Sequence, residues 1–328
     1  MDISNVPELV EKEGYALMLD EYAAQPVVYP LICKVEPIPD SEIYGTKGAV
    51  LTGLGRPIQI RDGQEVPADD IKSGYTWYLQ GRTFGRRLDL PYDVIRASDA
   101  VGRITGMVRE VTGGWGKAFA LEKDDMIADM FQKGTLTAGD VSLFDGTFPN
   151  ETDPYPGVVY DNLPWFDTAH TISGGTQTFS NHDVANALTT ANLQTALTRM
   201  RVTNAKDERN LRVRIAPNVL LVPAGAMGFT AKVILQSAQL PGSANNDANV
   251  VQGALEPIEW QALDDTASAN AWWLGEKGQG ILVRDEGPPK LAFVEDGLKR
   301  QISVVAVSHF GAAVTNWRYW YNANKAAA

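Results

Sequence analysis

The longest periodic segment of apolar residues predicts one long helix over residues 99–133. Apolar side chains recur there every three or four positions, Asp99 is placed to cap the first turn, and Gly134 is a natural stop. At a rise of 1.5 Å per residue, such a helix is about 50 Å long. Because five glycines lie within the segment, we also expect a bend near 113–116. The apolar positions of its first half are Val101, Ile104, Val108, Val111 and Trp115.

Shorter periodic segments predict three further helices, over residues 5–24, 181–200 and 224–237. The first of these begins with Asn5 as a cap, and Glu8 stands where a capping box needs it. Four prolines follow between residues 26 and 39, a density that disfavours a helix and predicts an extended arm.

Residues 44–90 combine eight glycines with short strand-like pieces and offer few side chains that could anchor them to a core. Two interpretations stay open. The segment is either a long β-hairpin that projects from the body, which the composition favours, or a small β-subdomain. An element that cannot bury itself within its own subunit commonly does so against a neighbour.

The last third of the chain alternates predicted strands with one helix. Strand-like apolar runs occupy residues 211–215, 218–222, 250–260, 271–275, 280–284 and 301–317, and an aromatic-rich stretch follows at 317–321. Together with the helices upstream, this order predicts an α+β fold with antiparallel strands at the end.

Composition adds limits to this picture. The 328 residues are 44% hydrophobic and 21% charged, as in ordinary folded proteins. The net charge of −11 disfavours binding to nucleic acid through its phosphates. Cys33 is the only cysteine, which excludes an intrachain disulfide and a thiolate metal cluster. No signal peptide is recognisable, and no run approaches the roughly 18 apolar residues that span a bilayer. We therefore expect a soluble protein made in the cytoplasm.

Motifs that would carry catalysis or cofactor binding are missing from the sequence. Gly53-x-Gly55 does not open a helix, and the glycines at 113–116 lack the serine or threonine of a phosphate loop. The three histidines have no metal-binding spacing, so His170 is interpreted as a structural residue. We predict no catalytic, cofactor or metal site.

Paired carboxylates and aromatic residues leave an enzyme as the alternative of another class, a hydrolase with an Asp/Glu pair in an aromatic cleft. The pairs are sequence neighbours, which do not face each other on a helix or a strand. We therefore interpret each pair as solvated surface charge and assign the aromatic residues to a core or an interface. The pairs are Asp69-Asp70, Asp124-Asp125 and Asp264-Asp265.

Arginines concentrate on the glycine-rich segment of this acidic chain. They either pair locally with Asp89 and Asp93, which contributes little at a surface, or form a basic arm that reaches an acidic neighbour. Both interpretations stay open. The residues concerned are Arg56, Arg61, Arg82, Arg86 and Arg87.

Six short motifs in the second half occur in a recognisable order and span residues 160–321. They are Trp165-Phe-Asp-Thr-Ala-His170 with Ser180-Asn181, Leu193-x-x-Ala196-x-x-x-Met200, Ile215-Ala-Pro-Asn-x-Leu-Leu-Val-Pro223, Asn249-Val250-x-x-Gly253, Ala271-Trp-Trp-Leu274, and Trp317-Arg-x-x-Tyr321. In this order they resemble the major capsid proteins of tailed bacteriophages, within these the Mu-type major head subunits.

The resemblance implies the Hong-Kong-phage-type capsid fold and names for the predicted segments. These are an N-terminal arm (1–43), an extended loop (44–90), a peripheral domain (91–209) with its spine helix (99–133), an axial domain (210–290) and a return to the peripheral domain (291–328). Residues 135–160 are longer and more proline-rich than the family pattern. The implied inter-subunit contacts of the extended loop are Lys47, Arg56, Arg61, Trp77, Arg82, Arg86 and Arg87.

The implied function is structural: self-assembly into hexamers and pentamers of an icosahedral phage head that encloses double-stranded DNA without reading its sequence. The 43 residues before the loop are too few for a built-in scaffolding domain, so a separate scaffolding protein is expected. A portal protein and, in some heads, a decoration protein are further partners, with assembly in the cytoplasm of the host bacterium. Some relatives form a covalent cross-link between a lysine and an asparagine of a neighbouring subunit. By its position, Lys47 or Lys72 would be the corresponding lysine here. A bacterial nanocompartment shell, which shares the fold, is the alternative.

Overall fold

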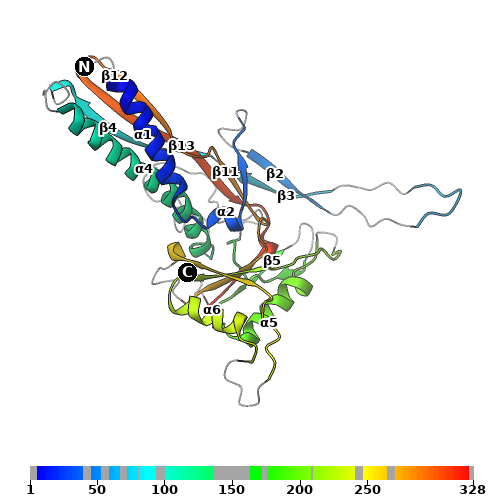
Figure 1. Ribbon diagram of the computed structural model, residues 1–328. Coiled ribbons are helices and arrows are strands. Elements are labelled where there is room, and N and C mark those ends of the chain that lie inside the picture. The colour runs from blue at the N-terminus through cyan, green and yellow to red at the C-terminus, as the bar shows by residue number, and fades with distance from the viewer. Residues whose placement is uncertain are drawn as a thin grey trace.

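The chain forms two five-stranded sheets, each accompanied by helices, and a separate two-stranded hairpin that projects from them (Figure 1). This mixed content confirms the predicted α+β class. The computed structural model describes residues 6–39, 46–52, 59–66, 72–79, 81–93, 100–135, 163–171, 176–207, 210–240, 247–263 and 270–324.

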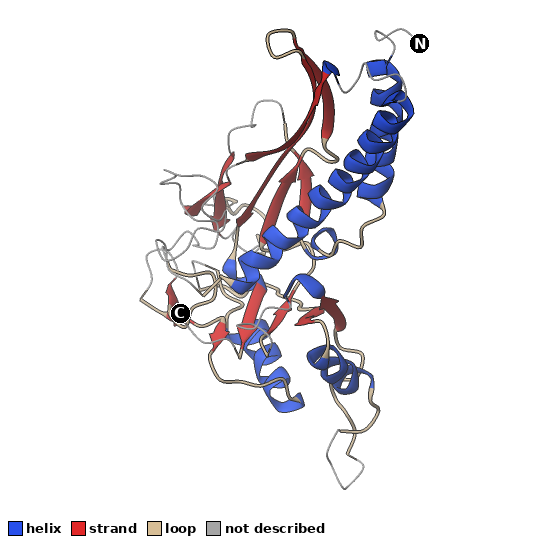
Figure 2. Ribbon diagram, turned by 90° about the vertical axis from the view of Figure 1, so that its left-hand side faces the viewer, coloured by secondary structure: helices blue, strands red, loops and turns tan. Residues whose placement is uncertain are grey.

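The first body is built on the longest strand, β13 (Gln301–Val314). On one side β13 pairs with β4 (Arg82–Pro91), and on the other with β12 (Lys290–Asp296) and then β11 (Ile281–Asp285), all antiparallel. The short β1 (Lys34–Pro37) adds to β11 in parallel. Two helices lie along this sheet, α4 (Ala100–Gln132) and, beside it, α1 (Val6–Ala23) (Figure 2).

The second body is a sheet in the order β7-β14-β10-β8-β9. Its central strands are short and buried throughout, as expected for a sheet covered on both faces. Helices α5 (Thr190–Thr198) and α6 (Ala226–Gln236) belong to this body, and a π-helical turn (Arg199–Thr203) extends α5. The strands are β7 (His182–Asp183), β8 (Val219–Pro223), β9 (Glu256–Trp260), β10 (Trp272–Gly275) and β14 (Trp320–Ala323).

Aromatic residues join the two bodies in one core. Phe131, near the end of α4, lies 4.7 Å from Trp165 and 4.9 Å from Trp320, measured between ring centroids. Trp260 and Trp273 complete the ring of neighbours, and all five side chains are at most 1% exposed. Edge-to-face aromatic packing of this kind stabilises a core beyond its buried area. The aromatics therefore fill the interior, as the sequence predicted.

The hairpin consists of β2 (Thr46–Thr52) and β3 (Lys72–Leu79), which pair antiparallel with an irregularity between Ala49 and Leu51. It leaves the first body sideways and carries residues 59–66 far from the rest of the molecule (Figure 1). A second small pair, β5 (His170–Thr171) with β6 (Thr178–Phe179), lies by the second body. The projecting hairpin, one of the two interpretations of residues 44–90, is thus the one observed.

The predicted extended arm over residues 26–39 was wrong in part. Tyr29–Ile32 form a one-turn helix, α2, because Pro30 stands in its first turn, where a missing N–H does no harm. Tyr29 and Ile32 are buried against the aromatic core, and β1 follows within the sheet. With α1 packed on α4 as well, the described part of the predicted 1–43 arm belongs to the first body.

Two further element predictions need correction. The helix predicted from residue 181 begins at Thr190, because Asn181 is fully buried and its side chain bonds the backbone of Trp165 instead of capping a helix. Thr189 is the true cap, accepting a hydrogen bond from the Asn192 amide. The strand predicted at 211–215 is reduced to a single bridge, between Lys206 and Arg212.

The predicted segment boundaries also shift. Strand β11 lies within the predicted axial segment 210–290 but pairs in the first sheet. Strand β14 lies within the predicted return 291–328 but pairs in the second sheet, as does β7 from the segment 91–209. The reason is that strand pairing between distant residues, and not sequence order, decides membership of a sheet. Most of residues 135–160 lie outside the described residues.

Candidate assembly interface

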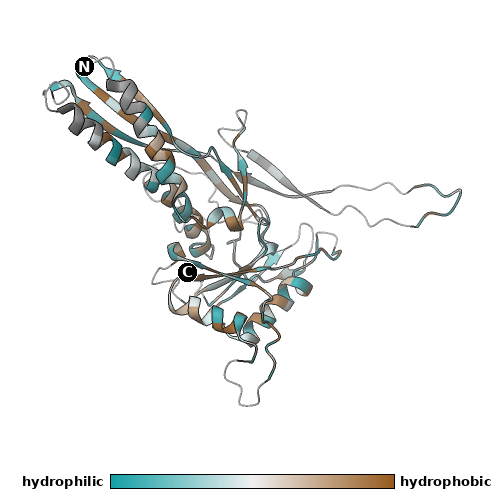
Figure 3. Ribbon diagram, in the orientation of Figure 1, coloured by the Kyte–Doolittle hydropathy of each residue, from teal (hydrophilic) through white to brown (hydrophobic). Residues whose placement is uncertain are grey.

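The tip of the hairpin, residues 59–66, is exposed at every position. A tight turn forms it: the Gln64 amide donates to the Arg61 carbonyl at 3.0 Å, and Gly63 adopts a positive φ of 85°. Two large apolar side chains flank this turn, Ile60 at 42% and Val66 at 71% exposure. Apolar residues therefore flank a hydrophilic turn at the end of the projection (Figure 3). Such a surface has no partner within the part of its own chain that the structure describes.

The hairpin proper carries no net charge, which argues against one of the two open interpretations of the arginines, a basic arm. Residues 46–79 hold four basic and four acidic side chains. Arg82, Arg86 and Arg87, which gave the predicted loop its positive charge, lie in β4 and thus in the first sheet. The predicted boundary at residue 90 was wrong because β4 pairs with β13 over ten residues. The hairpin ends at Leu79.

Individual predicted contact residues fall in different places. Lys47 stands in β2 and Arg61 in the exposed tip, whereas Arg56 lies outside the described residues. Trp77 is half-buried in its own hairpin: a Cβ added at Gly48 would lie 2.1 Å from the Trp77 ring, so the ring occupies the space above that glycine. Trp77 also packs toward Leu79, which is buried against β11 and β13. The observed partners of Trp77 are therefore within its own chain.

The arginines of β4 point to opposite faces of the sheet. Arg87 faces away from α4 and pairs with Asp89 at 2.8 Å. A hydrogen bond from Ser303 lowers the pKa of that Asp89 carboxyl, and Arg87 adds to the effect. Arg86 lies on the face toward α4 because side chains alternate along a strand. It is exposed and has no hydrogen bond or ion pair among the described residues.

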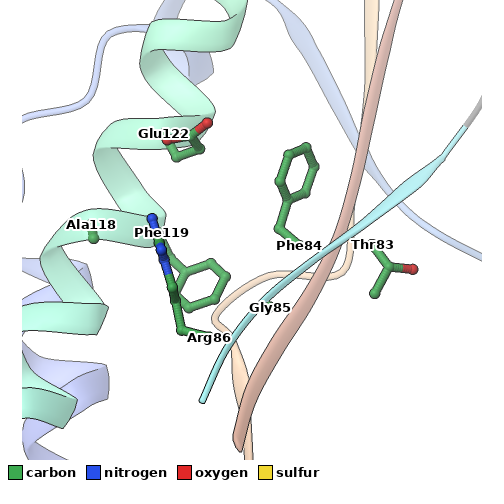
Figure 4. Close-up of a pocket in the computed structure, with 7 residues that line it drawn as sticks. All are labelled: Thr83, Phe84, Gly85, Arg86, Ala118, Phe119 and Glu122. Atoms are coloured by element: carbon green, nitrogen blue, oxygen red, sulfur yellow. The ribbon is translucent and has the colours of Figure 1, made fainter. Parts of the chain in front are cut away.

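A pocket of about 370 Å³ opens between β4 and α4. The rings of Phe84, from the strand, and Phe119, from the helix, lie in the space between the two elements, and Arg86 reaches from the strand toward the helix (Figure 4). Glu122 stands one helical turn further along. The pocket thus combines an aromatic floor with one charge of each sign. Its lining residues are Thr83, Phe84, Gly85, Arg86, Ala118, Phe119 and Glu122.

Helix α4 carries the residues predicted for the spine. Val108 is fully buried against Leu90 and Val304, and Trp115 is half-buried where two hydrophobic clusters meet. Val111 is half-buried. Val101 and Ile104 lie in the first turns of the helix, where the structure describes the backbone but not the side chains. The helix runs uninterrupted through residues 113–116. Two of the glycines there instead give α1 room to approach.

A buried polar network joins α4 to the N-terminal segment and to both sheets. The Lys123 ammonium donates to Asp285 Oδ1 at 2.7 Å, to the Gly287 carbonyl at 2.6 Å and to the Tyr22 hydroxyl at 3.0 Å. The Tyr29 hydroxyl donates to the other carboxylate oxygen of Asp285 at 3.0 Å. Burial raises the pKa of that hydroxyl, and the charge of Asp285 adds to the effect.

Asp124 extends this network to the second body and corrects its interpretation as surface charge. Its carboxylate is 5% exposed and accepts from the amides of Val28 and Tyr29 at 2.7 and 2.9 Å, and from Trp260 Nε1 at 2.6 Å. No sequence signal distinguishes Asp124 from Asp125, which faces solvent. The other two aspartate pairs, at 69–70 and 264–265, lie outside the described residues.

The histidines occupy structural positions. His170 is fully buried and stacks on Trp317 at 4.4 Å, as expected for a structural residue. His182 is buried in β7, and burial lowers its pKa. His309 shares a hydrogen bond of 2.8 Å with the Thr83 hydroxyl. Within the described ranges, no three His, Cys, Asp or Glu side chains gather in a way that could hold a metal ion. In the same ranges, no helix is long and apolar enough to cross a membrane.

Comparison with known proteins identifies the family. The profile of the family described as phage capsid protein matches residues 78–323, about three quarters of the sequence. The chain belongs to the phage capsid protein family. The match begins near the end of β3 and takes in α4 and every strand of the two five-stranded sheets except β1. This membership makes the chain a structural protein of the bacteriophage capsid and argues against catalysis as its role.

Solved structures show the same fold at low sequence identity. The capsid structure of Cyanophage P-SCSP1u superposes with a TM-score of 0.52 at 10% identity, over 92% of this chain and 89% of that one. The mature capsid of bacteriophage PhiM1 gives 0.51 at 9% identity, over 91% and 87%. No protein of curated function matches the sequence. The similarity to the two solved structures is therefore one of architecture.

Proposed function

We propose that this phage capsid protein is the Mu-type major head subunit of a tailed phage, with the Hong-Kong-phage-type fold. It assembles into hexamers and pentamers that close an icosahedral head around double-stranded DNA. The observation that carries the proposal is the hairpin, which holds an exposed, partly apolar tip far from its own body (Figure 1). In an isolated monomer the apolar groups of this element stay exposed to water, whereas in a shell of interlocking copies they can be buried against a neighbouring subunit.

The parts of the chain then take the names of the family's domains, with the corrected boundaries. The hairpin of residues 46–79 is the extended loop, and the first body with α4 as its spine is the peripheral domain. The second body is the axial domain. The inter-subunit contacts proposed for the loop and its base are Lys47, Arg56, Arg61 and, from β4, Arg86.

The charge of the chain fits a container for DNA. A net charge of −11 makes unspecific contact with DNA phosphates unfavourable on average. The shell can therefore enclose DNA without binding it tightly. A separate scaffolding protein, a portal protein and, in some heads, a decoration protein are the partners proposed. Assembly takes place in the host bacterial cytoplasm, and the virion is the final location.

Electron microscopy tests this function directly. The full chain is expressed alone and, in parallel, together with the other head proteins of its phage, and both preparations are viewed by negative stain. We expect hollow closed particles or rings of five and six copies in at least the second preparation. A monodisperse monomer in both preparations would contradict the proposal. Closed particles filled with a protein cargo in place of DNA would favour the nanocompartment shell.

Charge reversal on β4 separates an assembly residue from a neighbour that only pairs locally. Arg86→Glu should lower the yield of particles strongly. Arg86 is exposed and has no partner among the described residues, so a glutamate in its place would repel an acidic group of a neighbouring subunit that the arginine attracts. Arg87→Glu should leave assembly intact, since Arg87 is engaged with Asp89 on the other face of the sheet. The double variant should fold but form no shells. Particle yield and thermal unfolding of each purified subunit check this, and equal yields from both single variants would refute it.

A further inference from the structure

We propose that Asp62, at the tip of the hairpin, is a site of spontaneous covalent modification, where the aspartate isomerises to isoaspartate through a cyclic succinimide. The reaction needs a side-chain carboxyl that the next backbone amide can reach, and glycine at the next position offers no side chain to hinder that approach. The sequence holds three Asp-Gly pairs, at residues 62–63, 145–146 and 296–297. The second pair lies outside the described residues, and the structure distinguishes the other two.

The reaction conserves atoms and needs water as its only co-reactant. The Gly63 amide nitrogen attacks Cγ of Asp62 and forms a new C–N bond, while the amide proton and the carboxyl hydroxyl leave together as water. Water then adds to one of the two carbonyl groups of the succinimide ring and opens it. If the bond from nitrogen to the original main-chain carbonyl breaks, the main chain runs through the Asp62 side chain as isoaspartate. If the other C–N bond breaks, aspartate is restored.

Both reacting groups at the tip are exposed and unengaged. The Asp62 carboxylate accepts no hydrogen bond and forms no ion pair with the residues that the structure describes. Asp62 and Gly63 are the central residues of the turn that the Gln64 amide closes on the Arg61 carbonyl. The Gly63 amide donates to no backbone carbonyl of the described ranges, and a Cβ added at this glycine would meet nothing within 4 Å. Attack by this amide therefore breaks no existing contact.

Asp296 has the same neighbour in sequence but the opposite surroundings. Its Oδ1 accepts hydrogen bonds from the amides of Leu298 and Lys299, each at 3.1 Å. Its main chain is held as well, because Asp296 ends β12 and pairs with Gln301 of β13. The carboxyl must leave both amides before the Gly297 nitrogen can attack it. We therefore expect Asp296 to resist the isomerisation that Asp62 undergoes.

Isomerisation changes the shape of the tip without touching the body. It adds one carbon atom to the main chain at Asp62 and leaves the free carboxylate directly on Cα. A tight turn depends on the dihedral angles of a few residues, so the added atom changes the turn. The tip lies far from both sheets, and their packing should stay as it is (Figure 1). The surface at the end of the projection therefore comes to differ between newly made and aged subunits.

Peptide mapping of the purified full chain tests the site. The folded protein is aged in water enriched in heavy oxygen and then digested in ordinary water with an endoproteinase that cleaves before aspartate but not before isoaspartate. Uncut, labelled peptide should accumulate at Asp62 at least roughly tenfold faster than at Asp296, since breaking one hydrogen bond to a carboxylate slows a reaction by about that factor. In guanidinium chloride the two sites should react at similar rates, because the hydrogen bonds of Asp296 are then lost.

Two variants of the exposed tip complete the test. Asp62→Glu keeps the charge but would have to close a larger ring, so the heavy-oxygen label at residue 62 should disappear. Asp62→Asn forms the same succinimide by loss of ammonia and should yield isoaspartate faster, which shows that the digest detects the product. Equal rates at Asp62 and Asp296 in the folded protein would overturn the proposal, as would a wild-type tip that stays unmodified while Asp62→Asn reacts. Neither result bears on shell assembly, because every measurement uses the unassembled subunit.

Discussion

Replacing Lys123 by methionine should lower the free energy of unfolding of the subunit by about 3–5 kcal/mol, because it leaves the Asp285 carboxylate buried without its counter-charge. The two side chains are 3% and 8% exposed and lie 2.7 Å apart. The Gly287 carbonyl and the Tyr22 hydroxyl lose a donor at the same time. Methionine keeps the length and apolar stem of lysine, so the loss reports on the charge. Urea unfolding of dissociated subunits measures it.

The matched control is an exposed lysine in the turn between β12 and β13. Lys299 is 63% exposed and lies 3.8 Å from Asp296, so Lys299→Met should change stability by less than about 0.5 kcal/mol. Adding Asp285→Asn to Lys123→Met should recover part of the loss, since the buried charge disappears while Tyr29 keeps an oxygen acceptor. If Lys123→Met and Lys299→Met lowered the free energy of unfolding equally little, the hydrogen bonds of Lys123 would not hold α4 to β11 as their burial indicates.

This network also bears on assembly, because it fixes how the two bodies meet. Lys123 binds β11 of the first sheet, and its neighbour Asp124 binds Trp260 of the second. Two adjacent residues of α4 thus hold both sheets through short hydrogen bonds in a dry environment, where such bonds are strongest. A subunit that must repeat one shape throughout a shell needs this angle to be the same in every copy.

The sequence predicted local elements well and long-range pairing poorly. The 33-residue helix α4 begins and ends within one residue of its prediction, because its apolar period is a local signal. Strand β4 was misplaced in the projecting loop, because its partner β13 lies more than two hundred residues away and no local pattern reveals the pairing. Three arginines assigned to the loop therefore lie in the sheet, and the hairpin lacks the positive charge that a basic arm requires.

The candidate site was predictable to the same extent. Poor anchoring and many glycines indicated that residues 44–90 project from the body, and the hairpin does. The pocket could not be foreseen, since it exists only where β4 crosses α4. The burial of Asp124 could not be predicted either. It depends on hydrogen bonds from Val28, Tyr29 and Trp260, which are distant in the sequence, so no local pattern around Asp124 indicates them.

Two glycines of α4, two positions apart, should respond to alanine with opposite signs. Gly116 faces α1, and a Cβ there would lie 2.3 Å from the Met18 carbonyl oxygen and 3.1 Å from the Tyr22 amide nitrogen. These are backbone atoms, so α1 itself has to move, and overpacking of this kind costs about 1–3 kcal/mol or more. At Gly114 nothing lies within 4 Å, so alanine there should stabilise the helix by about 0.5–1 kcal/mol.

The difference between Gly116→Ala and Gly114→Ala isolates the contact between α1 and α4, because both substitutions change helix propensity alike. Denaturant unfolding of the two purified subunits gives that difference, expected at about 2 kcal/mol or more. Equal stabilisation by both would mean that α1 does not rest on α4 in solution.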